Sequence, residues 1–206
     1  MMAAGAFSGN WGGSNFGGKV AQFSVGICTE ATLTKEEADK VFAEMPDNVD
    51  LSYLYNLAAV LQMLPSDYSL PPPVTSAIRR LLDDISDIEL APIEFLASLQ
   101  IILEHVEHEN ALSWLRKAVQ GRQNADGGFG IYPGDPSDFC STYLNVRLLT
   151  NLGLPFDRNA VLTWLLSHKL PQGGFSMNDY GAFDLDATFY ALHTLVLMSE
   201  TVKGGS

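Results

Sequence analysis

Hydrophobic side chains recur every three or four residues along most of this chain, which is the spacing of one face of an α-helix. Leu54, Leu57, Leu61 and Leu64 follow this spacing, and the period-two alternation that would predict β-strands is scarce. Prolines and capping residues divide the pattern into segments. The sequence therefore predicts an all-α fold, with helices at about 34–45, 50–64, 73–85, 92–105, 111–120, 137–152, 159–168 and 184–199.

One motif in the second half of the chain occurs twice in constant register. The segment DGGFG at 126–130 returns as QGGFS at 172–176, and the cluster DFCST at 138–142 returns as DLDAT at 184–188, each 46 positions further on. Two turns and two helix starts in register indicate a structural repeat. Each repeat combines a shorter helix with a Trp-Leu pair, a Gly-Gly-Phe turn and a longer, more apolar helix.

Pairing the predicted helices gives about four helical hairpins within one domain over 31–206, preceded by a Gly-rich arm at 1–30. The repeat units are predicted at about 34–64, 73–106, 111–152 and 159–199. The helices around 139–149 and 183–196 are apolar on most faces, which predicts a buried inner layer, with the Trp-bearing helices outside. Such hairpins stack into an arc, or enclose a central cavity if the inner layer closes.

Composition narrows the classes of partner. The 206 residues include 47% hydrophobic residues, enough for a full core, and 12 basic against 24 acidic residues give a formal charge of −12. This charge disfavours nucleic acids and anionic membrane surfaces. Two distant cysteines, Cys28 and Cys140, provide no disulfide framework. With no apolar run of about 20 residues and no signal-peptide pattern, a cytoplasmic protein without a transmembrane segment is expected.

Acidic residues at the starts of the two apolar helices are the first candidates for chemistry. Asp138 and Asp184 lie where a carboxylate accepts amide hydrogen bonds, so helix capping alone explains them. Asp186 lies two residues past a good cap and is expected at the mouth of an apolar cavity. A carboxyl group in that place can keep its proton and act as an acid.

Aromatic residues near these acids are candidates for a cavity wall. Tyr143, Phe183, Phe189 and Tyr190 could stabilise a cationic intermediate through their π faces. Aromatic residues at helical spacing are also typical of an ordinary core, and both interpretations stay open.

The repeated motifs resemble those of a known superfamily. The segment 123–130 (QNADGGFG), followed by 138–142 and then by its second copy at 172–192, resembles the repeat of protein prenyltransferase β subunits and of squalene or oxidosqualene cyclases. The resemblance extends over about 114–198. It implies an (α/α) toroid of concentric helices around an apolar cavity that holds isoprenoid chains.

The cyclase side of the resemblance implies acid catalysis. The cyclase motif Asp-x-Asp-Asp-Thr matches Asp184, Asp186 and Thr188, with Ala187 in place of its third acid. This implies Asp186 as the general acid of a protonation-initiated cyclisation and Asp184 as its positioning partner. The substrate-binding wall is then formed by Tyr143, Phe183, Phe189 and Tyr190, together with Asp138 and Cys140.

The prenyltransferase side of the resemblance implies a zinc site that is degenerate here. Asp138 and Cys140 match an Asp-x-Cys pair of zinc ligands, but Ala187 stands where the third ligand, a histidine, is expected. A mononuclear catalytic zinc normally has three protein ligands. We therefore expect no metal and no cofactor, and Cys140 is interpreted as a small buried residue.

Four functions remain open at this point. The chain is interpreted first as a terpene-cyclase-like enzyme acting on an apolar isoprenoid. It is alternatively a non-catalytic isoprenoid- or lipid-binding protein, or a prenyltransferase-β-like protein. The fourth interpretation is an interaction scaffold, because about four hairpins leave the ring incomplete. A homodimer or another protein partner would then close the ring.

Overall fold

The computed structural model describes residues 32–45, 53–87, 90–177 and 181–203. The Gly-rich arm predicted at 1–30 lies outside these residues. Within them the fold is all-α, as predicted, and β-structure is limited to isolated bridges. The helices are α2 (Lys35–Ala43), α3 (Leu54–Gln62), α4 (Pro72–Asp83), η3 (Asp84–Asp87), α5 (Ile93–His105), α6 (Glu109–Val119), α7 (Phe139–Asn151), α8 (Arg158–Ser167) and α9 (Leu185–Lys203).

Each predicted helix is found, with boundaries shifted by a few residues, and the start predicted for the second helix at about 50 lies outside the described residues. Thr34 caps α2 through a capping box, in which the Glu37 backbone N–H donates to Thr34 Oγ1 and the Thr34 N–H donates to Glu37 Oε2. The largest extension is at α9, which continues to Lys203. None of the helices in the described ranges combines the length and the apolar character needed to cross a bilayer.

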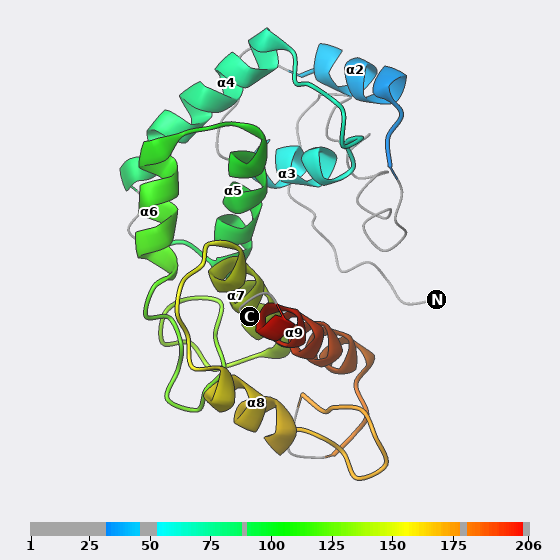
Figure 1. Ribbon diagram of the computed structural model, residues 1–206, viewed down its shortest axis with the longest axis vertical. Helices are drawn as coiled ribbons and strands as arrows, with labels where there is room; N and C mark the ends of the chain where they lie inside the picture. Colours follow the sequence, from blue (N-terminus) through cyan, green and yellow to red (C-terminus); the bar gives the residue numbers. More distant parts are fainter. Residues whose placement is uncertain (1–31, 46–52, 88–89, 178–180, 204–206) are drawn as a thin grey trace. The chain divides into compact units, whose positions relative to one another are not determined.

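The chain divides into two compact units, Met1–Leu81 and Leu82–Ser206. The single domain predicted over 31–206, with its repeat boundaries, stays a prediction. The first unit contains α2, α3 and the greater part of α4 (Figure 1), and each of these helices carries buried apolar side chains, among them Phe42, Leu57 and Ile78. The Leu33 N–H donates to the Met63 carbonyl oxygen at 2.7 Å and joins the start of this unit to the end of α3.

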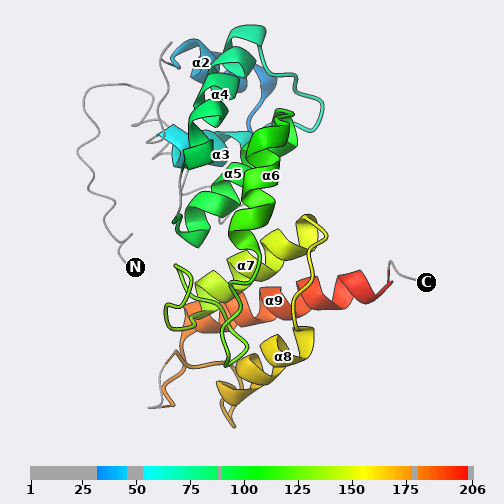
Figure 2. The ribbon, with the colours of Figure 1, turned by 90° about the vertical axis from the view of Figure 1, so that its left-hand side faces the viewer.

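In the second unit, successive longer helices pack against one another. α7 contacts α5 and α9, while α6 packs on α5 and α8 packs on α9. Figure 2 shows α7 and α9 side by side, with α8 next to α9. The longer helices α5, α7 and α9 thus pack one on the next in a row. The shorter, Trp-bearing helices α6 and α8 alternate with them along the chain, as predicted.

The two repeats differ in burial. Phe139, Val146 and Leu149 of α7 are buried, whereas Phe189 and Leu192 of α9 are about half exposed (50% and 52%). The prediction that the helix around 183–196 is buried on most of its faces is therefore wrong for α9. The physical reason is that no later helix among the described residues covers the face of α9 that points away from α7.

Candidate functional site

The Gly-Gly-Phe turns are joined to the following helices by the same hydrogen bonds in both repeats. In the first repeat, the Phe129 N–H donates to Thr142 Oγ1 at 3.0 Å, and the Asp138 N–H donates to the Phe129 carbonyl oxygen at 3.1 Å. The second repeat makes both bonds at 3.0 Å, through Phe175, Thr188 and Asp184. The threonine of the acid–threonine cluster therefore ties the turn to the helix, a role that the sequence analysis did not assign.

Asp138 and Asp184 act as N-caps, which is the structural interpretation given to them above. Asp138 Oδ1 accepts from the Ser141 N–H, and Asp184 Oδ1 accepts from the Ala187 N–H, both at 2.8 Å. These bonds satisfy backbone donors that have no partner within the helix. Each carboxylate thus has one oxygen committed to its own helix start.

A cluster of five side chains forms where α7 and α9 lie side by side. We call it the aromatic cluster: Cys140, Tyr143, Phe189, Tyr190 and His193. Ring centroids are 5.7 Å apart for Tyr143 and Tyr190, 5.9 Å for Tyr143 and His193, and 4.2 Å for Phe189 and His193. Tyr190 also forms a hydrogen bond with Cys140. Four rings and one thiol from two helices therefore make a continuous, mainly apolar wall.

His193 is the member of this cluster that the sequence analysis missed as a site residue. His193 lies six residues beyond Ala187, so it does not take the place of the expected third zinc ligand. Its spacing from Phe189 and Tyr190, four and three residues, does place it on the same side of α9 as both rings. That spacing is the signal that could have identified it.

The Cys140 thiol and the Tyr190 phenol of the aromatic cluster favour their uncharged forms. Burial raises the pKa of the Cys140 thiol, and the nearby carboxylates of Asp138 and Asp186 raise it further, against a lowering by the hydrogen bond from Tyr190. Burial, followed by the bond to Cys140, raises the pKa of Tyr190 as well. The thiol and the phenol are therefore both protonated at neutral pH.

Other predicted site residues lie in more open positions. Asp186 is exposed, and Phe183 is 58% exposed. The ring of Phe183 lies over Gly174, where an added Cβ would approach it to 2.6 Å. Phe183 therefore covers the second turn, and Asp186 lacks the desolvated surroundings expected for a general acid.

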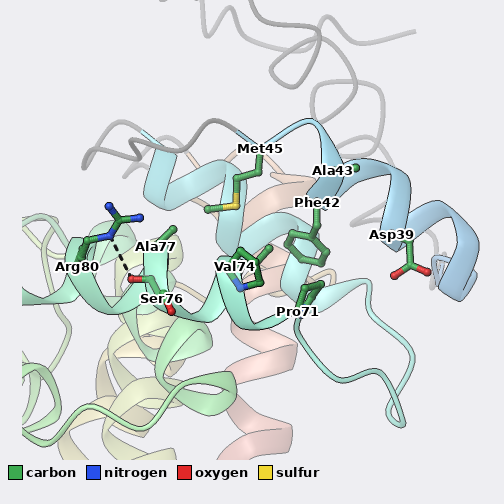
Figure 3. A pocket seen from close by; sticks show the side chains of 10 residues that line it. Asp39, Phe42, Ala43, Met45, Pro71, Val74, Ser76, Ala77 and Arg80 are labelled. Carbon is green, nitrogen blue, oxygen red and sulfur yellow. Dashed lines mark hydrogen bonds between the residues drawn. The ribbon is translucent and has the colours of Figure 1, made fainter.

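A cavity of about 560 Å³ lies in the first unit and contains none of the predicted site residues. Its apolar wall comes from α2 and α4 and includes Phe42, Val74 and Ala77, with Asp39 and Arg80 toward opposite ends (Figure 3). Arg80 Nε donates to the Ser76 carbonyl oxygen at 3.4 Å. A second cavity of about 460 Å³ lies between α5, α6 and the end of α7. It is also separate from the aromatic cluster.

The donor set does not fit the zinc ion that the prenyltransferase resemblance implies. Asp138 is engaged as a helix cap, and Cys140 is a hydrogen-bonded thiol of raised pKa. Ala187, at the position of the expected third ligand, is fully buried, and His193 stacks on Phe189. No group of three or more His, Cys, Asp or Glu side chains in the described ranges could hold a metal ion.

Helical hairpins with paired Gly-Gly-Phe turns define an α/α repeat protein, and comparison with known proteins identifies the family. Residues 90–204, more than half of the chain, match the family model described as "Prenyltransferase alpha-alpha toroid domain". The chain belongs to this family. Comparison with solved structures gives no significant match.

Two curated relatives are protein farnesyltransferase β subunits. The one from Arabidopsis thaliana is 29% identical over 112 residues, which are 50% of this chain and 22% of that protein. The one from Pisum sativum is 29% identical over 89 residues, which are 41% of this chain and 20% of that protein. The chain thus spans about a fifth of the length of these relatives. They agree with the prenyltransferase side of the resemblance and give no support to the cyclase side.

Proposed function

We propose that this chain is an isoprenoid-binding module of the prenyltransferase β type, and that the aromatic cluster is its binding wall. The observation that carries the proposal is the mutual contact of Tyr143, Phe189, Tyr190 and His193 on two adjacent helices of the toroid-family region. Because the relatives are named farnesyltransferase subunits, a farnesyl chain is the preferred ligand.

The chemistry of the cluster suits the hydrocarbon part of such a ligand. Burying apolar surface contributes roughly 0.8 kcal/mol per CH₂ group, so a branched chain laid across four rings gains several such increments. The uncharged thiol and phenol add no desolvated charge to oppose this burial. No cationic side chain belongs to the cluster, so we expect a diphosphate group to add little to binding.

The acidic residues receive structural roles in this proposal. Asp138 and Asp184 hold the helix starts that carry Cys140 and the neighbouring rings. We assign no general-acid role to Asp186, because it is exposed. Since the donor set does not fit zinc, binding of the isoprenoid is proposed for this chain and prenyl transfer is not.

The second part of the proposal concerns assembly. The relatives are named β subunits, which implies a further subunit in those proteins. We propose that this chain likewise works together with another polypeptide that completes the wall around the isoprenoid.

The test is equilibrium dialysis of the full chain with labelled farnesyl diphosphate, with farnesol and inorganic diphosphate as competitors. We expect farnesol to compete and inorganic diphosphate to leave binding unchanged. Tyr143→Ala should weaken binding about tenfold, since one lost aromatic contact is worth roughly 1.5 kcal/mol.

The matched control is Tyr132→Ala, because Tyr132 is an exposed tyrosine outside the aromatic cluster. It should bind as the unaltered chain does. Competition by inorganic diphosphate alone, or equal losses in both variants, would contradict the proposed binding wall.

A further inference from the structure

The cavity of about 560 Å³ in the first unit shares no residue with the aromatic cluster and has no part in isoprenoid binding as proposed above. Its volume lies within the range of about 300–1,000 Å³ that is typical of binding pockets. Helices α2 and α4 provide its walls, and Figure 3 shows Asp39 at one end and Arg80 at the other. The cavity is therefore an apolar groove with an acidic end and a basic end.

Small side chains leave the space between the two helices. Ala43 of α2 and Ser76 and Ala77 of α4 line the cavity, together with the buried ring of Phe42. Met45 lies at the same wall, and a methionine side chain adapts readily to the shape of what it contacts. These residues can accept apolar side chains of different shapes.

The acidic end of the cavity is held in place by Tyr68. The Tyr68 hydroxyl donates to Asp39 Oδ1 at 2.7 Å, and the Tyr68 ring stacks on Phe42 with 6.0 Å between centroids. Burial, together with the hydrogen bond to Asp39, raises the pKa of Tyr68 to about 12, so this hydroxyl remains a donor at neutral pH. Asp39 and Phe42 are thus positioned before a ligand arrives, which lowers the entropic cost of binding.

We propose that this cavity binds an amphipathic helix of a partner protein, with the first turn of that helix at Arg80 and its last turn at Asp39. A groove between two helices accepts apolar residues spaced i, i+4 and i+7 on a third helix. Along α4 the cavity extends from Pro73 to Arg80, about 10 Å at 1.5 Å per residue, which is the span of three such residues.

The charges at the two ends select the direction of the bound helix. Helices commonly carry acidic residues in the first turn and basic residues in the last, because these charges interact favourably with the helix dipole. A helix of this ordinary kind is complementary to the cavity when its acidic turn faces Arg80 and its basic turn faces Asp39. The reversed helix would place like charges together at both ends.

The experiment is a fluorescence-anisotropy titration of the full chain into labelled synthetic peptides. The first peptide is an amphipathic helix with leucines at i, i+4 and i+7, two glutamates in its first turn and two lysines in its last. The second peptide has the glutamates and lysines exchanged. We expect saturable binding of the first peptide, at least threefold tighter than that of the second. Equal affinities, or no saturable binding of either peptide, would overturn the proposal.

A blocking variant checks where the peptide binds. Ala43 is exposed and lines the cavity, so Ala43→Trp places a large ring in the groove without disturbing a buried position. It should weaken binding of the first peptide tenfold or more, with an unchanged circular dichroism spectrum. Unchanged affinity in this variant would place the peptide elsewhere on the chain and contradict the proposal.

A charge variant tests the pairing at the acidic end. Asp39→Asn removes the charge and keeps an oxygen that can accept from the Tyr68 hydroxyl. It should weaken the first peptide about threefold, since an exposed ion pair contributes little, and should not change the affinity for a third peptide with glutamines in place of the lysines.

The matched control is Glu36→Gln, because Glu36 is an exposed acid on the same helix that does not line the cavity. It should bind the first peptide as the unaltered chain does. Equal weakening by Asp39→Asn and Glu36→Gln would reduce the effect to net charge and overturn the pairing. None of these measurements needs isoprenoid binding, so the two proposals can fail separately.

Discussion

α7 and α9 are the equivalent helices of the two repeats, yet one is an interior helix and the other is half exposed. Their starts have the same construction, with an aspartate cap at 2.8 Å and a threonine that binds the preceding turn. The surroundings of the two helices differ: among the described residues, α7 packs mainly on α5, α6 and α9, whereas α9 packs mainly on α7 and α8. The repeated motif therefore determines the local hydrogen bonds, whereas the helices packed around each helix determine how far it is buried.

The largest expected difference between the repeats comes from one pair of equivalent positions. Phe139 is buried and Leu185, 46 positions later, is mostly exposed. Phe139→Ala should lower the free energy of unfolding by about 3–5 kcal/mol, and Leu185→Ala by less than about 0.5 kcal/mol. Urea denaturation at a concentration where the protein is monomeric measures both. Similar decreases in the free energy of unfolding for the two variants would mean that Leu185 of α9 is already buried within one molecule.

The glycine turns give the next largest contrast. Gly127 and Gly173 have φ values of 98° and 97°, which disfavour any side chain. An added Cβ at Gly127 also meets the Ala160 backbone carbonyl, whereas at Gly173 it meets nothing within 4 Å. Gly173→Ala should cost about 1–2 kcal/mol, from backbone strain alone. Gly127→Ala should cost roughly 2–5 kcal/mol, because overpacking is added.

Thermal and urea unfolding of these two glycine variants measure the contrast. If Gly173→Ala lowered the free energy of unfolding as much as Gly127→Ala does, the two turns would be equally crowded, which would contradict the structure.

The helix caps should show no contrast between the repeats. Asp138→Ala and Asp184→Ala each remove one carboxylate bond to a helix-start amide at 2.8 Å. Each should lower the free energy of unfolding by about 1 kcal/mol. Urea denaturation of both variants, with the asparagine replacements as controls that keep capping ability, measures this. A difference well above 1 kcal/mol between the two sites would show that one carboxylate does more than cap its helix.

The smallest effect concerns the thiol of the aromatic cluster. Burial raises the pKa of Cys140, so at mildly alkaline pH its thiolate fraction in the folded protein is lower than in the unfolded chain. Alkylation by iodoacetamide, measured against pH in a Cys28→Ser background, should have a midpoint above that of a free cysteine. Asp186→Asn removes one of the charges that raise this pKa and should lower the midpoint slightly. A midpoint at or below that of free cysteine would contradict the buried, neutral thiol.

Much of the fold could be predicted because its signals are local. Thr34, Asp138 and Asp184 are read from the sequence as helix starts and are found as caps. Hydrophobic spacing and prolines bound the helices to within a few residues. The constant 46-residue register predicts two equivalent turns, and their hydrogen bonds agree to within about 0.1 Å.

The candidate site was predicted less completely, because it depends on two helices meeting. Tyr143, Phe189 and Tyr190 were identified from their types and positions, but the pairing of Cys140 with Tyr190 needs the packing of α7 on α9. The place of His193 in the cluster needs that packing as well. The exposure of Asp186 depends on which side of α9 faces α7, and the cap itself carries no information about that.

The sequence by itself determined the helices, their caps and the repeated turns, since each depends on interactions within a few residues or on a repeated register. Only the tertiary structure decided that one apolar helix is enclosed while its equivalent presents Leu185, Phe189 and Leu192 to solvent. The physical reason is that an apolar stripe shows which side of a helix tends to be buried. The neighbouring element that buries this side lies elsewhere in the chain or on another molecule, and the stripe does not identify it.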